Sequence, residues 1–246
     1  MNSYRLKIAD HILEVVMPFR TSRRNLVEFL SNDQPEIQIV FGDEIIIDKE
    51  SVYGEKDDLL GWQGNVDISA LLQRIADEYI DFDTLLMHGA AIAYENQAYI
   101  FTAPSGTGKT THIAKWLDNC SDAFVINGDK PFIKFSDNGP PLVYGSPWAG
   151  KENEFANTMV SLKAIIFLER NEDNSIYKIS FAEAFPVLLK QIYRPANEEK
   201  MRKTLKLIQK LNTGVSFWHF NCNNFKDDCF AVAYNALVCV DKKGDN

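Results

Sequence analysis

The sequence predicts an α/β fold with a small β-rich N-terminal cap and a C-terminal extension of helix, strand and helix. Three observations carry this prediction. Apolar runs of strand length fill the middle of the chain, a glycine-containing loop separates one of them from a helical pattern, and short alternating runs dominate the N-terminal part. We expect the cap over residues 1–82, the core over 83–195 and the extension over 196–246.

Length and composition are those of an ordinary globular protein. A chain of 246 residues with 46% hydrophobic residues can bury a sizeable core. Its formal net charge of -8 disfavours a general nucleic-acid-binding surface, which needs clustered Lys and Arg. The sequence lacks both the apolar core of a secretory signal and a run of roughly twenty apolar residues, so we expect a cytoplasmic protein with no membrane partner.

The four cysteines show no close pair and no Cys/His cluster with the spacing of zinc ligands. Their low density favours reduced thiols over disulfides.

Short strands are predicted for the cap. Residues 12–16, 36–41 and 44–47 alternate or are β-branched, and Gly42-Asp43 forms a turn between the last two runs. Residues 68–79 carry apolar side chains at helical intervals, and Asp67 precedes them as an N-cap.

The core is predicted to alternate strands with a helix. Residues 85–93 and 97–102 form two buried strands joined near Glu95-Asn96, and the second strand leads into the loop 103–110. A helix over 110–117 and buried strands over 123–127 and 164–169 follow, in the order of an α/β nucleotide-binding fold.

The extension begins with an amphipathic helix over residues 197–211, which Gly214 terminates. A strand over 215–220 and a helix over 228–240 complete it. The Lys and Arg residues of the first helix form a basic face, which is either solvated or docks an acidic substrate.

The loop 103–110 is the strongest chemical signal. Successive backbone N–H groups of a glycine-containing turn before a helix bind phosphate, and Gly106 and Gly108 allow that backbone. Lys109 would reach the outer phosphates, and the Thr110 hydroxyl would bind magnesium. The pattern G-x-x-x-x-G-K-[ST] is met except at its first position, where Ala103 requires ordinary dihedral angles.

Phosphoryl transfer also needs a carboxylate, usually at the end of a neighbouring strand. Asp129 follows the strand 123–127 and could meet Thr110 across a magnesium ion. The alternative interpretation is a turn residue, which the flanking Gly128 and Pro131 make credible.

Together these motifs resemble the HPr kinase/phosphorylase family and its relatives, including kinases from peptide-maturation gene clusters, with a loop also similar to that of phosphoenolpyruvate carboxykinases. The resemblance covers residues 85–169. It rests on His88-Gly89, on 160–169 as a strand ending in Leu-Glu, on Asn127-Gly128-Asp129, and on the loop residues Ser105, Gly106, Thr107, Gly108, Lys109, Thr110 and Thr111.

The resemblance implies a P-loop HPr kinase/carboxykinase-like core in which His88 and Asp129 take part in metal binding and proton handling. Family members carry two aspartates after this strand, and Gly128 stands here at the first position. Another group, or the substrate, would then handle the proton. From the residues alone, His88 is equally compatible with a satisfied histidine beside an apolar strand.

The segment 144–153 has the composition of a mobile binding loop. Lys151 would neutralise phosphate charge, and Glu152 would bind metal or orient a hydroxyl. A surface turn with Trp148 packed inward is the alternative. Gln191 and Arg194 are weaker candidates, Arg194 for the nucleotide or for a helix C-terminus.

These observations predict a kinase that uses ATP and Mg2+ to phosphorylate a hydroxyl, serine-like, on a protein, a peptide or a small molecule. A non-catalytic ATP-binding module of a peptide-modification or regulatory system is the alternative, and a carboxykinase is less favoured because its dicarboxylate-binding groups have no counterparts here. The resemblance also implies a homo-oligomer.

Overall fold

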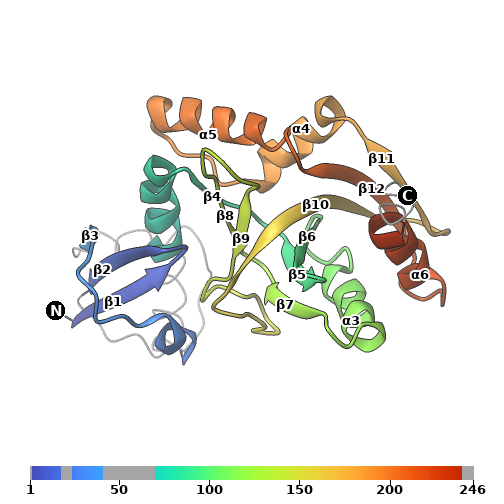
Figure 1. The fold of residues 1–246 in the computed structure, drawn as a ribbon, viewed down its shortest axis with the longest axis horizontal. Coiled ribbons are helices and arrows are strands. Elements are labelled where there is room, and N and C mark those ends of the chain that lie inside the picture. Colours follow the sequence, from blue (N-terminus) through green and yellow to red (C-terminus); the bar gives the residue numbers. More distant parts are fainter. Residues whose placement is uncertain (1, 18–23, 41–69, 240–246) are drawn as a thin grey trace, which may run out of the picture.

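The computed structural model describes residues 2–17, 24–40 and 70–239 (Figure 1). The predicted strand 44–47, the Gly42-Asp43 turn and the Asp67 cap lie outside these residues. Within them, the N-terminal part forms a three-stranded sheet of β1 (Asn2–Ile8), β2 (His11–Met17) and β3 (Ile37–Val40), followed by a helix over 70–79. The 3-10 helix η1 (Arg24–Phe29) lies between β2 and β3.

The second sheet is mixed and holds nine strands in the described part of the chain, with the main order β4-β8-β9-β10-β6-β5-β7. The strands are β4 (Thr84–Leu86), β5 (Ala90–Tyr94), β6 (Gln97–Thr102), β7 (Phe124–Asn127), β8 (Phe132–Lys134), β9 (Leu142–Tyr144), β10 (Met159–Arg170), β11 (Ser175–Ile179) and β12 (Ser216–Cys222).

Strand β10 is the centre of this sheet and is longer than the predicted 164–169. One of its edges pairs with β6 in parallel. Its start pairs with β9, and its end pairs in parallel with β12, which also takes β11 as a neighbour. The strand of the predicted C-terminal extension therefore belongs to the central sheet.

The apolar run predicted as one strand over 85–93 is broken into β4 and β5. At the break, the backbone N–H groups of Met87, His88 and Gly89 donate to carbonyl oxygens of Pro131, Gln191 and Asp129 at 3.1, 2.7 and 3.0 Å. These long-range bonds replace a continuous ladder. The predicted turn at Glu95-Asn96 joins β5 to β6, with both residues at positive φ as a two-residue hairpin turn requires.

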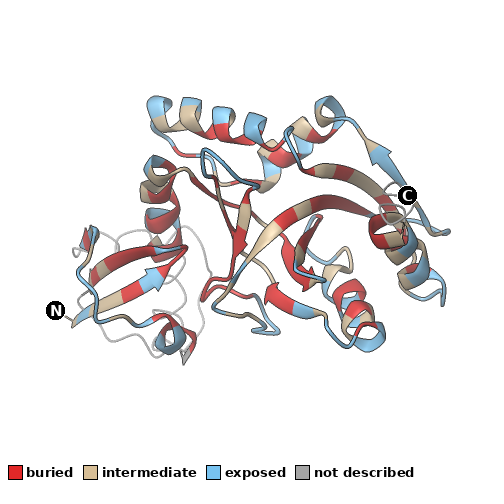
Figure 2. Cartoon of the chain, viewed as in Figure 1, coloured by how far each residue is buried: buried red, intermediate tan, exposed pale blue. Residues whose placement is uncertain are grey.

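Helices cover the nine-stranded sheet (Figures 1 and 2). Helix α3 (Lys109–Asn119) follows the loop, α4 (Phe181–Gln191) and α5 (Glu198–Lys210) lie along the top of the molecule, and α6 (Cys229–Tyr234) continues into the π-helical turn η4 (Asn235–Cys239). The α5 prediction is confirmed, with Asn197 capping its N-terminus and Gly214 at φ +88° beyond its end. Helix α4 was not predicted.

The N-terminal cap packs directly on the core. Lys134 Nζ of β8 donates to Ala9 O of the cap at 3.1 Å, and within the cap the Tyr79 hydroxyl donates to Ile8 O at 2.8 Å. One hydrophobic cluster combines residues of the three-stranded sheet with Phe132 and Trp148 from the core. This interface fixes the position of the cap over β8 and β9.

The basic face of α5 is largely neutralised within the chain. Lys200 Nζ lies 2.8 Å from an Asp77 carboxylate oxygen and 3.3 Å from one of Asp81, and Lys203 Nζ lies 2.9 Å from Asp83. These ion pairs favour the solvated, structural interpretation of this face over docking of an acidic substrate.

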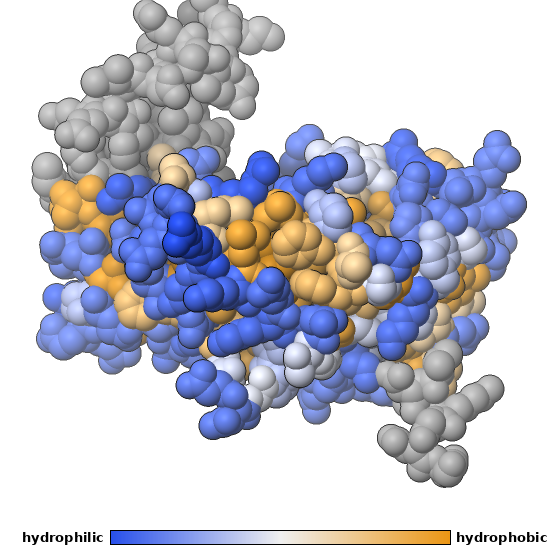
Figure 3. Space-filling view, turned by 90° about the horizontal axis from the view of Figure 1, so that it is seen from above, coloured by the Kyte–Doolittle hydropathy of each residue, from blue (hydrophilic) through white to orange (hydrophobic). Residues whose placement is uncertain are grey.

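Seen from above, a hydrophobic area lies on the side of the molecule that carries α4 and α5, bordered by polar and charged residues (Figure 3). Val187 of α4 is 37% exposed, and Phe181, Phe185 and Leu189 are half-buried. Among the described residues, no helix has the length and apolar character needed to span a bilayer.

Helix α4 depends on a capping box, because Ser180 accepts from the Glu183 N–H while the Glu183 carboxylate accepts from the Ser180 N–H at 2.8 Å. We predict that Ser180→Ala lowers the free energy of unfolding by about 0.5–2 kcal/mol. Chemical denaturation measures this change, with the exposed Ser121→Ala as control, expected within about 0.5 kcal/mol of the parent. Equal stability of the two variants would contradict the role of the cap.

Candidate functional site

The loop 103–110 follows β6 and leads into α3, as predicted, with Lys109 and Thr110 as the first two residues of the helix. Gly106 and Gly108 have φ values of +77° and +112°, which side chains rarely adopt, whereas Ala103 keeps an ordinary backbone conformation. Gly108 is the N-cap of α3. The loop therefore ends at the positive end of a helix, where anions bind.

Side chains donate hydrogen bonds to most carbonyl oxygens of the loop. Lys109 Nζ donates to Ala103 O at 2.9 Å and to Pro104 O at 3.4 Å, and the Thr107 hydroxyl donates to Pro104 O at 2.7 Å. Lys109, at the end of the loop, thus holds the backbone at the start of the loop.

Two residues from distant segments hold the rest of the loop. Arg170, the last residue of β10, donates to Gly106 O at 2.5 Å and to Thr107 O at 3.1 Å. Asn224, after β12, donates from Nδ2 to Gly108 O at 3.0 Å. Sequence patterns did not identify either residue, because neither lies in a motif and the contacts span 64 and 116 residues.

His88 and Asp129 face each other across the break between β4 and β5. His88 Nε2 lies 3.3 Å from Asp129 Oδ1, and His88 Nδ1 lies 2.9 Å from Gln191 Oε1. Lys130 Nζ lies 3.3 Å from the other Asp129 oxygen. His88 is therefore not a buried core residue: its side chain is 27% exposed and belongs to a polar cluster. Of the two weaker candidates, Gln191 joins this cluster, whereas Arg194 is exposed.

The backbone at Asp129 is fixed by a buried amide. Asn127 Oδ1 accepts from the N–H groups of Asp129 and Lys130 at 2.9 and 2.6 Å. Asn127 Nδ2 donates to the carbonyl and hydroxyl oxygens of Ser146. This Asx-type turn agrees with the turn interpretation of Asp129, and it also holds the carboxylate beside His88.

Gly128 is required by packing. A Cβ atom at this position would lie 2.8 Å from Ala149 O and 3.4 Å from Glu154 O. The segment 145–154 therefore occupies the space that a side chain at position 128 needs, which explains physically why a second carboxylate is absent here.

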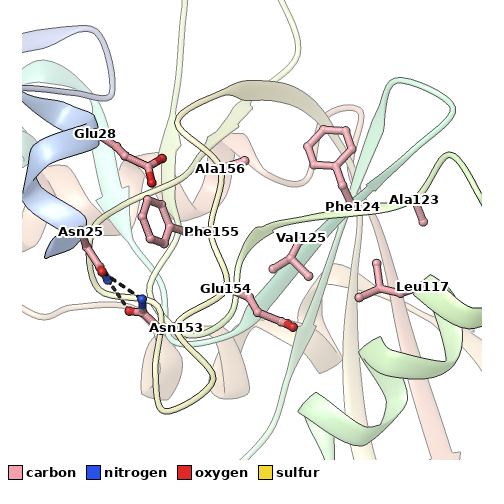
Figure 4. A pocket seen from close by; sticks show the side chains of 10 residues that line it. All are labelled: Asn25, Glu28, Leu117, Ala123, Phe124, Val125, Asn153, Glu154, Phe155 and Ala156. Atoms are coloured by element: carbon pink, nitrogen blue, oxygen red, sulfur yellow. Dashed lines mark hydrogen bonds between the residues drawn. The ribbon is translucent and has the colours of Figure 1, made fainter.

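The segment 144–153 combines the two interpretations offered for it, a binding loop and a surface turn with Trp148 packed inward. Trp148 is buried, at 5% exposure, while Lys151 and Glu152 are exposed. Asn25 of η1 donates to Pro147 O at 3.0 Å and exchanges hydrogen bonds with the Asn153 side chain. The cap thus braces this segment, and a groove of about 620 Å³ opens beside it, between η1, β7 and the end of α3 (Figure 4).

A cavity of about 450 Å³ brings together nearly all the predicted site residues. Only Thr107 of the predicted loop set is not in its wall. The wall consists of His88, Ser105, Gly106, Gly108, Lys109, Thr110, Thr111, Gly128, Asp129, Gly150, Lys151, Glu152 and Arg170.

The electrostatics of the cavity favour a carboxylate at Asp129. Burial raises the pKa of Asp129, but the hydrogen bond from His88 and the charges of Lys130 and His88 outweigh it and hold that pKa below its ordinary value. Burial lowers the pKa of Lys109, against the opposing effect of Asp129. The cavity thus pairs an anionic wall with the cationic side chains that a phosphate chain would contact.

No protein-family model and no curated protein matches the sequence. Among solved structures, the chain is similar to the Hpr(Ser) kinase/phosphatase from Coxiella burnetii, with a TM-score of 0.40 and 10% sequence identity. The matched region covers 65% of this chain and 94% of that one. At this distance the likeness assigns neither a family nor an activity to the chain.

We predict that Gly128→Ala lowers the free energy of unfolding by about 1–3 kcal/mol, because the added methyl group must displace the backbone of 149–154. Gly139→Ala is the matched control, since its Cβ would approach only the flexible Ser136 hydroxyl, at 3.2 Å. Thermal and chemical unfolding of both variants measure the difference. Unchanged stability of Gly128→Ala would show that the segment does not pack as described.

Proposed function

We propose that the protein is an ATP-dependent phosphotransferase that moves the γ-phosphate to a hydroxyl group. One observation carries the proposal: a single cavity is lined by the glycine-containing loop with Lys109 and Thr110, by His88 in contact with Asp129, and by the exposed Lys151 and Glu152. The acceptor is a serine-like hydroxyl on a protein, a peptide or a small molecule.

The loop would hold the phosphate chain of ATP. Gly106 has open space where a side chain would stand, which leaves room for close approach of oxygen atoms, and the end of α3 adds a positive potential. Lys109 donates to two loop carbonyls, and it would exchange these neutral acceptors for charged phosphate oxygens when a nucleotide binds. Arg170 keeps the loop in shape during this exchange, because it donates to two other carbonyls.

Magnesium fits the oxygen groups of the cavity. Mg2+ prefers hard oxygen ligands and is usually held by one or two protein groups together with substrate phosphates. The Thr110 hydroxyl and the Asp129 carboxylate both line the cavity, and the low pKa of Asp129 keeps it ionised at neutral pH. When bound, the ion neutralises charge on the transferring phosphoryl group.

Asp129 and His88 would manage the proton of the acceptor hydroxyl. An ionised carboxylate can accept that proton, and His88 fixes its orientation while Gln191 fixes the ring. Lys151 would stabilise charge on the equatorial phosphate oxygens, and Glu152 would orient the acceptor.

A non-catalytic nucleotide-binding module is the second candidate. It is favoured by the packing at Gly128, where Ala149 O leaves no space for the first of two acidic residues. Binding would then occur without transfer, and the segment 145–154 would signal nucleotide occupancy to the cap through Asn25.

We predict that incubation with γ-labelled ATP, Mg2+ and candidate serine-containing peptides or cell extract labels an acceptor. Lys109→Ala and Asp129→Asn should lower the initial rate by at least about 100-fold, since each removes a charge that acts on the phosphoryl group. Lys178→Ala, at an exposed position of β11, is the control for the loss of one charge and should retain the rate.

Thermal unfolding of the same variants separates the chemistry from folding. The Lys109→Ala midpoint should stay close to that of the parent, because a loop lysine contributes little to the core. Nucleotide binding without label transfer to any acceptor would favour the binding module, and wild-type rates in Lys109→Ala would refute the phosphotransferase.

A further inference from the structure

Two cysteines and a histidine, far apart in sequence, meet behind the loop. Cys222 ends β12, Cys229 begins α6, and His112 lies on α3, which runs beside α6 (Figure 1). The two sulfur atoms are 3.1 Å apart, and Cys229 Sγ is 3.4 Å from His112 Nδ1. All three side chains are buried. Sequence spacing could not reveal this cluster, because His112 and Cys229 are 117 residues apart.

The three ligand-type atoms lie within 4.8 Å of one another, but the surroundings of His112 oppose a metal ion. Trp116 Nε1, which can only donate, lies 3.1 Å from His112 Nε2. Nε2 must therefore accept, and Nδ1 carries the proton and points it at Cys229. A metal-binding histidine instead directs its second N–H toward an acceptor. The ring is arranged to donate to a sulfur anion.

We propose that Cys222 and Cys229 form a reversible disulfide whose formation loosens the loop 103–110. A disulfide needs its sulfur atoms at about 2.0 Å, so the pair must close by about 1 Å. The two cysteines flank a short turn over 223–228, most of which is exposed, and this turn can move to bring them together. The effect on the loop rests on the proposed nucleotide binding.

The two cysteines differ in pKa, which decides which of them acts as the nucleophile. The hydrogen bond from the Cys222 thiol lowers the pKa of Cys229 to about 5 against the opposing effect of burial, and His112 lowers it further. The same contact, together with burial, raises the pKa of Cys222. Cys229 is therefore the nucleophilic thiolate, and Cys222 keeps its proton until the second step.

A small peroxide is the oxidant that can reach this buried pair. The Cys229 thiolate attacks one peroxide oxygen and the O–O bond breaks, giving a sulfenic acid. The departing oxygen leaves as hydroxide or alkoxide and becomes water or alcohol by taking up from solvent the proton that Cys229 released when it ionised. Cys222 then attacks the Cys229 sulfur, the S–O bond breaks, and the Cys222 proton leaves with that oxygen as water. With hydrogen peroxide, two thiols are oxidised to one disulfide and the peroxide is reduced to two waters.

Asn224 connects this chemistry to the loop. Its Oδ1 is 3.3 Å from Cys222 Sγ and 3.4 Å from Cys229 Sγ, while its Nδ2 donates to Gly108 O. Disulfide formation removes the one remaining thiol proton, that of Cys222, and moves the ends of the turn that carries Asn224. A Cβ atom at Gly108 would lie 2.6 Å from Asn224 Nδ2, so the Asn224 amide packs directly against the loop at this glycine.

The experiment uses the full chain with Cys120→Ala and Cys239→Ala, so that only the pair remains among the four cysteines. After treatment with hydrogen peroxide and alkylation, peptide mapping by mass spectrometry should show a Cys222–Cys229 linkage that dithiothreitol reverses. Fluorescence titration with a labelled ATP analogue and Mg2+ should show an affinity about tenfold weaker in the oxidised form, the effect of losing one hydrogen bond that anchors the loop.

Cys222→Ser and Cys229→Ser should abolish the redox response, and Asn224→Ala should form the disulfide but lose the difference in affinity. Thiols that stay open to alkylation after peroxide, or one equivalent of zinc in the purified protein, would overturn the proposal. A disulfide with unchanged nucleotide affinity would refute the coupling to the loop. If neither form binds nucleotide, the phosphotransferase proposal and the coupling both fail, and mapping alone decides whether the disulfide forms.

Discussion

The candidate site depends on hydrogen bonds that outside donors make to the carbonyl oxygens of the loop 103–110. Arg170 holds Gly106 and Thr107 from the end of β10, and Asn224 holds Gly108 from the end of β12. These two strands are parallel neighbours in the central sheet. The shape of the loop is therefore set by the sheet, which explains how two glycines at positive φ can form a defined structure.

The same sheet places the acidic side of the cavity. The break between β4 and β5 turns His88 toward Asp129, and the N–H groups freed by the break find carbonyl oxygens at 129, 131 and 191. The Asn127 side chain fixes the turn at Asp129 by accepting from its N–H group. Asn25 of the cap holds the segment 145–154 by donating to Pro147 O. The site is thus built from at least four chain segments that only the tertiary fold brings together.

Local sequence predicted the features that local forces determine. The Glu95-Asn96 turn, the loop between β6 and α3, and the amphipathic helix α5 follow from turn preferences, motif and apolar spacing, and the structure confirms all three. The break at His88 could not be predicted, because the run 85–93 is predominantly apolar and the break depends on partners 40 or more residues away. Arg170, Asn224 and the meeting of His112 with Cys229 were missed for the same reason.

The central claim is that this externally held loop binds the phosphate chain of a nucleotide, and calorimetric titration tests it most directly. Mg·ATP should bind with one-to-one stoichiometry, and AMP, which lacks the outer phosphates that Lys109 would contact, should bind far more weakly. Folded protein that binds neither nucleotide, or that binds AMP as tightly as Mg·ATP, would contradict the claim.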